Sequence, residues 1–216
     1  GICSPAVVER ASCWKKPATR HSTIVITSAG RKEYLQKTIE SLRAHFQYDP
    51  EKTRWYIIDD YPASQETREY IQSLEGFDRK IFNTANMGLG HSLNKIYEEV
   101  ESEFVFHCED DWEFLRDIPV ERMMELLQQD SGLSQMLLYR ESKKPQYLDA
   151  RDTGRGYVEY DRIFSFNPHL SRMEVFLKLY PFPLYFTEYD YSIKVRQEEY
   201  RANGILGYNK EPYVRH

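Results

Sequence analysis

The sequence has little cysteine, no long apolar run and no excess of positive charge. Its three cysteines, Cys3, Cys13 and Cys108, cannot all pair and do not have the Cys-x-x-Cys spacing of a zinc ribbon. A disulfide scaffold and a structural zinc site are therefore disfavoured. No apolar run approaches the roughly 20 residues that cross a bilayer, and no signal-peptide core follows the N-terminus. We therefore expect no transmembrane segment and a cytoplasmic location.

The charge balance disfavours a further class of partner. The 216 residues carry 29 Lys and Arg against 34 Asp and Glu, which gives a net charge of -5. Sequence-independent binding of nucleic acid needs a basic face, so nucleic acid is not an expected partner. With 41% hydrophobic residues, the chain can bury a core and has the length of one domain.

Apolar runs and helical periodicity alternate along the first half of the chain. Residues 1–21 predict an irregular lead-in, and one domain is expected over residues 22–216. Short apolar runs predict strands at 23–27, 55–58, 80–82 and 104–106. Helical spacing predicts helices between them, over 34–46, 65–74 and 89–100. This alternation is typical of an α/β fold with a mostly parallel sheet, whose post-strand loops meet at one edge.

The strongest local feature is an acidic turn, Glu109-Asp110-Asp111, directly after the apolar strand at 104–106. Three adjacent carboxylates repel one another and resist burial unless a cation neutralises them. Oxygen ligands suit a hard ion such as Mg²⁺ or Mn²⁺. In an extended segment Glu109 and Asp111 point the same way and Asp110 points opposite. The alternative interpretation is a solvated acidic turn.

Two further motifs follow the second and third expected strands. Asp59-Asp60 ends the strand at 55–58, where a carboxylate commonly accepts hydrogen bonds from a ribose or base; a cap or turn pair is equally consistent. The segment Asn86-Met87-Gly88 precedes a helix and offers backbone N–H groups to a ligand. It lacks the ending of a phosphate-binding P-loop and the third glycine of a dinucleotide fingerprint.

Taken together, these motifs resemble the nucleotide-sugar half of a GT-A glycosyltransferase of the broad family-2 type. The order and spacing agree for a TxxxR turn, a DD pair, an NxGxxxxxN segment and a DxD motif whose first position is Glu. They correspond to Thr27–Arg31, Asp59-Asp60, Asn86 with Gly88 and Asn94, and the acidic turn. The resemblance implies a Rossmann-like GT-A domain with a nucleotide-binding half over 22–111 and a smaller acceptor and catalytic half over 112–216.

The resemblance also implies roles for the matching residues. Glu109 and Asp111 would bind a divalent cation, Mn²⁺ or Mg²⁺, with His216 as an additional ligand. Asp59 or Asp60 would hold the nucleoside, and Asp110 would contact the ribose or the sugar. The remaining donor-side positions would be Thr27, Ser28, Arg31, Asn86 and Gly88. The donor would be a nucleoside diphosphate sugar, for which UDP is the family's commonest carrier.

The second half of the chain carries the expected base. Thr187-Glu188 stands where the family has Glu-Asp before a helix, so Glu188 is the first candidate for the catalytic base and Asp190 the second. A structural interpretation is that Thr187 caps a helix whose first turn holds both carboxylates. The polar segment 141–162 predicts a loop or ribbon, in which Lys143, Lys144, Arg151 and Arg155 either close over a diphosphate or are solvated.

The function implied is a metal-dependent and inverting transfer of a sugar to a hydroxyl of a glycan-type acceptor. Two alternatives remain open at this stage. The first is a nucleotidyltransferase that acts on sugar phosphates, although Ser28-Ala29-Gly30-Arg31 matches its glycine-rich loop poorly. The second is a non-catalytic domain of the same fold that binds a glycan.

Overall fold

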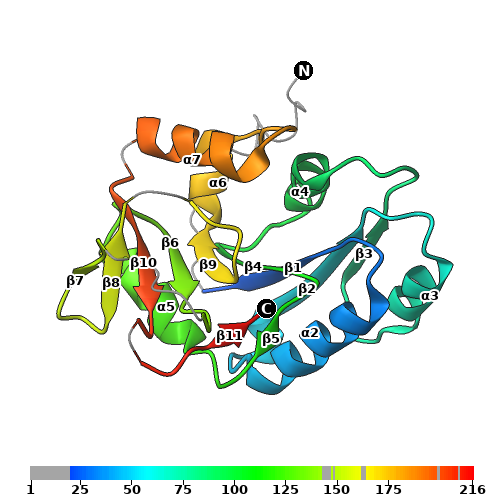
Figure 1. Cartoon of the computed structure of the whole chain (residues 1–216), viewed down its shortest axis with the longest axis horizontal. Helices are drawn as coiled ribbons and strands as arrows, with labels where there is room; N and C mark the ends of the chain where they lie inside the picture. Colours follow the sequence, from blue (N-terminus) through cyan, green and yellow to red (C-terminus); the bar gives the residue numbers. More distant parts are fainter. Residues whose placement is uncertain (1–19, 143–146, 148, 162–163, 199, 209) are drawn as a thin grey trace.

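The computed structural model describes residues 20–142, 147, 149–161, 164–198, 200–208 and 210–216. Figure 1 shows them as one large sheet with helices on both faces. Most of the expected lead-in, residues 1–19, lies outside the described residues, and the first strand begins at Ser22. None of the helices in the described part of the chain is long and apolar enough to cross a membrane.

The first half alternates strands and helices as expected. Its elements are β1 (Ser22–Ser28), α2 (Lys32–His45), the short 3-10 helix Pro50–Lys52, β2 (Thr53–Asp59), α3 (Gln65–Ser73), β3 (Arg79–Phe82), α4 (Leu89–Tyr97) and β4 (Phe104–Glu109). The strands are parallel in the order β3-β2-β1-β4. Because the chain returns past β1 to reach β4, the order of the strands reverses between them, which is where such sheets form a ligand crevice.

The second half extends the same sheet. Its elements are β5 (Glu113–Phe114), α5 (Val120–Gln129), β6 (Leu133–Leu138), β7 (Arg151–Asp152), β8 (Tyr157–Tyr160), β9 (His169–Arg172), α6 (Met173–Leu179), α7 (Thr187–Gln197), β10 (Ala202–Leu206) and β11 (Val214–Arg215). The sheet continues in the order β4-β9-β6-β10-β8-β7, with β9 antiparallel between β4 and β6. The segment 141–162, expected as a loop or ribbon, contains the paired strands β7 and β8, whereas the insertion of β9 was not predicted.

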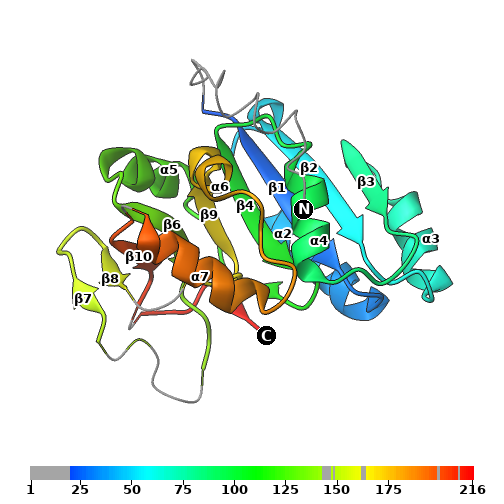
Figure 2. The same ribbon diagram turned by 90° about the horizontal axis from the view of Figure 1, so that it is seen from above.

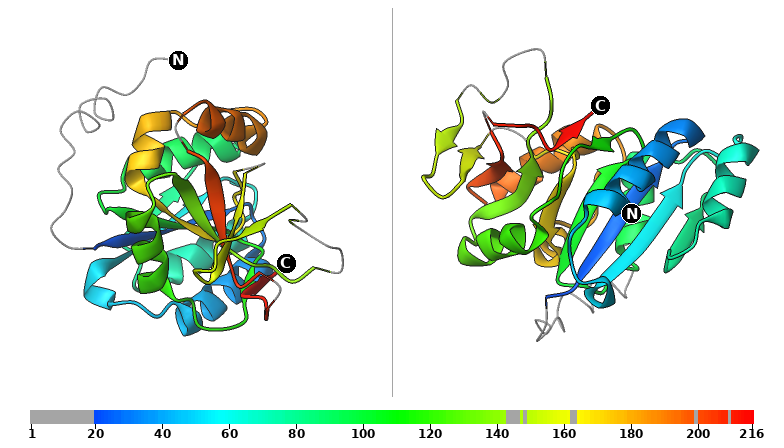
Figure 3. Two further views of the ribbon diagram at one scale, coloured as in Figure 1. Left: turned by 90° about the vertical axis from the view of Figure 1, so that its left-hand side faces the viewer. Right: turned by 90° about the horizontal axis from the view of Figure 1, so that it is seen from below.

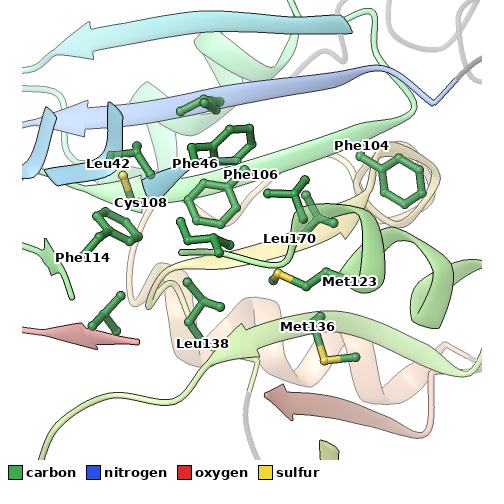
Figure 4. Close-up of a cluster of buried hydrophobic side chains, with 14 of the residues drawn as sticks. Leu42, Phe46, Phe104, Phe106, Cys108, Phe114, Met123, Met136, Leu138 and Leu170 are labelled. Carbon is green, nitrogen blue, oxygen red and sulfur yellow. The ribbon is translucent and has the colours of Figure 1, made fainter. Parts of the chain in front are cut away.

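Two apolar layers hold the helices onto the sheet. Ile24 and Ile26 of β1 face the layer under α2, α3 and α5, whereas Val25 faces the layer under α4, α6 and α7. The strand is buried on both faces, which explains its continuous apolar run. Figure 4 shows the first layer, in which the rings of Phe46 and Phe106 pack edge to face, 5.3 Å between centroids.

The topology places the carboxyl ends of β1, β2, β4, β6 and β10 at one edge of the sheet. Figure 2 shows this arrangement from above, with α4 and α7 on the same side of the sheet. The C-terminal strand β11 also returns to this edge, where it pairs with β5 directly after the acidic turn, as Figure 3 shows from below. Residues far apart in the sequence are thereby collected at one edge.

Candidate active site

A cavity of about 130 Å³ opens at the carboxyl edge between β1, β2 and β4. It is lined by Thr27, Ser28, Ala29, Arg31, Asp60, Leu89, Ser92, Glu109 and Asp110. Six of these residues were expected on the donor or metal side of a site. The convergence predicted from the motifs is therefore present, and Leu89 and Ser92 of α4 complete the wall.

The turn after β1 is shaped by a glycine. Gly30 has φ +78°, and a Cβ atom there would lie 2.3 Å from the ring of Tyr61. Only glycine tolerates both this backbone conformation and this close approach. The turn places the Ala29 N–H and the Arg31 side chain beside the acidic turn.

Arg31 holds the acidic turn together. The buried Asp110 carboxylate accepts a hydrogen bond from the Ala29 N–H at 2.8 Å and pairs with Arg31 Nη2. Arg31 Nη1 lies 2.9 Å from Asp111 Oδ2. The expectation that Asp110 and Asp111 point in opposite directions is wrong, because β4 ends at Glu109 and the chain turns there. One guanidinium therefore reaches two consecutive carboxylates.

Negative charge accumulates at Glu109. Burial raises its pKa, and the charges of Asp111, Asp110 and Glu188 raise it further, to about 7, although Arg31 opposes them. The contribution from Glu188 means that α7 brings this carboxylate within electrostatic reach of β4. A single arginine does not neutralise the group, so the site favours an additional cation.

The last residue of the chain lies against the acidic turn. His216 Nε2 is 3.0 Å from Asp111 Oδ2, and the His216 ring packs on Trp112 with centroids 4.9 Å apart. The pairing of β11 with β5 positions this end, supported by the ion pair between Arg215 and Glu113 at 2.6 Å. The sequence placed His216 at the metal site only through the resemblance, and the structure brings it to Asp111.

The donor atoms at the acidic turn fit a hard divalent cation. Asp111 Oδ1 is buried and has no hydrogen-bond partner among the described residues, and its other oxygen faces an imidazole nitrogen. Carboxylate oxygens with one imidazole are suitable ligands for Mn²⁺ or Mg²⁺. Within the described part of the chain, no three His, Cys, Asp or Glu side chains already form a complete ligand set. The protein would therefore supply part of a coordination sphere.

The two aspartates after β2 have different surroundings. Asp59 is fully buried and accepts hydrogen bonds from Ser28 Oγ at 3.0 Å and Arg68 Nε at 2.9 Å. Asp60 lines the cavity and accepts the backbone N–H groups of Met87 and Gly88 at 2.8 and 2.7 Å. Asp60 is thus the aspartate that faces the cavity, while Asp59 joins β1 to α3.

The segment before α4 also positions the second half of the chain. Gly88 precedes α4 with φ +87°, and Asn86 is exposed beside it. Asn94 holds the loop before α7, because its amide donates to Phe182 O at 3.0 Å and accepts from Phe182 N at 2.7 Å. Gly90 lets α4 approach this loop closely, because a Cβ atom at this position would lie 2.0 Å from Pro183 O.

The candidate bases lie at the start of α7. Glu188 Oε2 accepts the Phe166 N–H at 2.9 Å, which turns its carboxylate toward the loop that precedes β9. Asp190 lies in the same first turn. The expected cap is wrong: Phe186 precedes the helix with φ +47°, and the Thr187 hydroxyl instead donates to Pro183 O at 2.9 Å. Both carboxylates lie near the positive end of the helix dipole.

The basic residues of the ribbon lie elsewhere. Arg151 pairs with Glu159, and the Arg155 guanidinium lies 5.8 Å from the ring of Tyr157. Both are carried by the β7–β8 ribbon at the far end of the sheet from β4, which agrees with the solvated alternative. Lys143 and Lys144 lie outside the described residues.

Sequence reasoning missed Asn83. Its buried amide donates to Asp60 Oδ1 at 2.7 Å and to Ser92 Oγ at 3.0 Å, and its carbonyl oxygen faces Lys95 Nζ at 3.1 Å. The signal was available, because Asn83 is a polar residue immediately after β3. It links the carboxyl edge of the sheet to α4.

A comparison with models of protein families gives one match. The model described as Glycosyl transferase family 2 matches residues 23–186. This segment runs from β1 to the residue before α7, so Glu188, Asp190 and His216 lie beyond it. No curated protein matches the sequence.

Solved structures share the fold at low identity. TarS residues 1–349 from S. aureus, in complex with UDP-GlcNAc, matches with a TM-score of 0.68 and 12% identity, over 91% of this chain and 58% of that chain. GalNAc-T7 with UDP, GalNAc and Mn²⁺ matches with a TM-score of 0.71 and 12% identity, over 93% of this chain and 44% of that chain. The mannosyltransferase PcManGT from Pyrobaculum calidifontis, with GDP-Man and Mn²⁺, matches with a TM-score of 0.66 and 14% identity, over 95% of this chain and 64% of that chain. The chain thus spans less than two thirds of each.

Proposed function

The chain belongs to glycosyl transferase family 2 and has the GT-A fold, and from this premise we propose that it transfers a sugar from a nucleoside diphosphate sugar to a hydroxyl group of a glycan-type acceptor. In this proposal residues 22–111 supply the donor side, and residues 112–216 supply the acceptor side and the base. The observation that carries it is the convergence of Arg31, Asp60 and the acidic turn on one cavity at the carboxyl edge.

On the donor side, the cavity walls have complementary chemistry. Asp60 offers a carboxylate to the ribose or base from the end of β2. Thr27 and Ser28, the last residues of β1, line the cavity beside Asp60. Arg31 supplies a positive charge where the diphosphate would bind. Arginine binds phosphate oxygens through its planar fork of N–H donors, so a diphosphate could compete with Asp111 for this side chain.

The metal ligands in this proposal are Glu109, Asp111 and His216. The raised pKa of Glu109, about 7, and the unpartnered Asp111 Oδ1 both support a cation at the turn. When bound, Mn²⁺ or Mg²⁺ would offset the charge that develops on the departing nucleoside diphosphate. The similar structures of GalNAc-T7 and PcManGT contain Mn²⁺, which supports the same choice of ion.

We assign the base to Glu188 before Asp190. Glu188 lies within electrostatic reach of Glu109 on the donor side, and its Oε2 accepts a hydrogen bond from the Phe166 N–H. As the acceptor oxygen attacks the anomeric carbon, Glu188 would take the hydroxyl proton. Attack opposite the leaving diphosphate inverts the anomeric configuration.

The experiment that tests this function measures binding and product release together. The chain is incubated with UDP- and GDP-linked sugars, with and without Mn²⁺, and unfolding temperature, nucleoside diphosphate and pyrophosphate are followed. A donor at about 100 times its Kd stabilises the fold by about 2.7 kcal/mol. We expect one donor to raise the unfolding temperature with Mn²⁺ and to release nucleoside diphosphate. Release of pyrophosphate, or no response to any donor, contradicts the proposal.

A further inference from the structure

A second and larger cavity, of about 470 Å³, lies at the other end of the same sheet edge. It opens between the β7–β8 turn and the segment that follows β10, and its lining includes Asp152, Gly154, Gly156, Tyr208 and Lys210. The turn lies at the carboxyl edge because Tyr157, which begins β8, pairs with Leu206, which ends β10. Both cavities therefore open on the edge where the chemistry is expected.

A row of contacts leads from this cavity to the candidate base. The Tyr208 hydroxyl donates to Tyr147 O at 3.2 Å, and their rings lie 6.4 Å apart. The Tyr147 hydroxyl makes a hydrogen bond with the Asn167 side chain and lies within electrostatic reach of Glu188. Phe166 directly precedes Asn167 in the chain, and its N–H donates a hydrogen bond to Glu188 Oε2.

The chemistry of the lining indicates the class of ligand. The Tyr208 ring is half-buried and packs on Tyr139, with centroids 5.5 Å apart, so it offers an apolar face with a polar edge. Asp152 and Lys210 contribute one charge of each sign, which favours a neutral ligand rather than an anion. A sugar ring, with apolar C–H faces and hydroxyl groups at its rim, matches this combination.

The position of the cavity indicates the length of the ligand. β4 and β10 are separated by two strands, β9 and β6, which corresponds to roughly 15 Å along the sheet edge. A ligand that occupies the cavity beyond β10 and also reaches the acidic turn at the end of β4 must span this distance. A single sugar does not reach that far.

We infer that this cavity is a subsite for the remote, non-reacting end of a neutral oligosaccharide acceptor, which runs past Tyr208 and Tyr147 to Glu188. The inference rests on the proposed function and names the acceptor class for it. Binding energy gained at such a distance from the reacting hydroxyl would position the acceptor for transfer. No bond is made or broken in the cavity.

The test measures binding of the whole chain to an array of neutral and anionic oligosaccharides that range from one sugar to six. We expect retention of neutral oligosaccharides of three sugars or more and no retention of monosaccharides. Retention of no glycan, a preference for anionic glycans, or equal retention of monosaccharides would overturn the inference.

Matched variants separate the cavity from the rest of the surface. Gly154 and Gly156 have φ +67° and +85°, and a Cβ at either position meets nothing within 4 Å. Asparagine adopts positive φ more often than most residues, so Gly154→Asn and Gly156→Asn add a polar side chain at two lining positions, with a backbone strain that a matched control at another positive-φ glycine shares. Each should weaken glycan binding by about tenfold or more. The control Gly76→Asn, at φ +76° in the turn after α3, should leave it unchanged.

Donor binding, measured on the same proteins, distinguishes two kinds of failure. All three variants should bind a nucleotide sugar with Mn²⁺ as the unaltered chain does. If the donor binds and the glycans do not, or if Gly154→Asn and Gly156→Asn bind glycans normally, the cavity inference fails while the proposed function stands. If the unaltered chain binds no donor, the proposed function fails, and with it the inference that depends on it.

Discussion

Arg31 and Asp111 form an ion pair with 2.9 Å between Nη1 and Oδ2, and the same guanidinium also pairs with Asp110. The side chain of Arg31 is 44% exposed, whereas that of Asp110 is 1% exposed. Arg31 is thus a counter-charge of the acidic turn, and it lines the cavity in which we propose that the diphosphate binds.

The first prediction concerns this counter-charge. Arg31→Gln should raise the affinity for Mn²⁺ alone by roughly three- to tenfold, because a positive charge beside the carboxylates is removed. It should weaken binding of the nucleotide sugar, because a phosphate-binding group is lost. Calorimetric titration of each ligand checks both. Lys32→Gln, which removes a charge paired with Glu66, is the control. A loss of affinity for both ligands contradicts the account.

The second prediction concerns the base. Glu188→Gln keeps an oxygen that can accept the Phe166 N–H but cannot take a proton, so kcat should fall by about 10²- to 10⁴-fold. Donor affinity should stay the same. Asp190→Asn removes a carboxylate from the same helical turn and serves as the matched variant. If Asp190→Asn shows the large loss and Glu188→Gln does not, the assignment of the base is reversed.

The third prediction concerns the contact between α4 and the loop that carries α7. Gly90→Ala adds a methyl group that would lie 2.0 Å from Pro183 O and 2.9 Å from Thr187 Oγ1. Although alanine is the better helix former, this overpacking should lower the free energy of unfolding by about 1–3 kcal/mol. Urea unfolding measures the change. His91→Ala, one position along α4, should change the stability by no more than about 0.5 kcal/mol. If Gly90→Ala and His91→Ala have the same free energy of unfolding, the prediction is wrong.

The fourth prediction concerns stability in acid. His169 of β9 is buried and stacks on His107 of β4, with ring centroids 5.4 Å apart. Burial lowers the pKa of His169 to about 4. Since this is below the value near 6.5 in the unfolded chain, the unfolded state takes up the proton first as the pH falls. The folded state should therefore lose up to about 3 kcal/mol between pH 6.5 and 4.

Urea unfolding at several pH values checks this loss. His169→Asn removes the titrating group, so its stability should fall less steeply between pH 6.5 and 4 than that of the unaltered chain. His91→Gln, a histidine in α4, should keep the original slope. Identical slopes for His169→Asn and the unaltered chain would show that another group controls the acid response.

The first half of the fold follows from its sequence because local and long-range preferences agree there. The apolar run from Thr23 to Thr27 is buried on both faces in β1, and residues 65–74 fold into α3 almost as expected. The convergence of Arg31, Asp60 and Glu109 was also predictable, since parallel strands with short crossovers bring their carboxyl ends together.

The features that escaped prediction depend on packing between distant segments. β9 enters the sheet antiparallel to β4 through the pairing of His107 with His169, and nothing in either local pattern specifies that partner. The direction of Asp110 depends on the Arg31 side chain, and that of Glu188 depends on the Phe166 N–H. Such contacts are determined by the tertiary structure and not by spacing along the chain.

The central claim is that the acidic turn holds a divalent cation together with a nucleoside diphosphate sugar. Its most direct test is calorimetric titration of UDP- and GDP-linked sugars into the chain and into Asp111→Asn, with and without Mn²⁺. Asp117→Asn, whose carboxylate pairs with His45, is the control. The account predicts that Mn²⁺ strengthens donor binding by at least about tenfold in the unaltered chain and the control, and that Asp111→Asn abolishes this gain. Donor binding that is indifferent to both Mn²⁺ and Asp111 would contradict it.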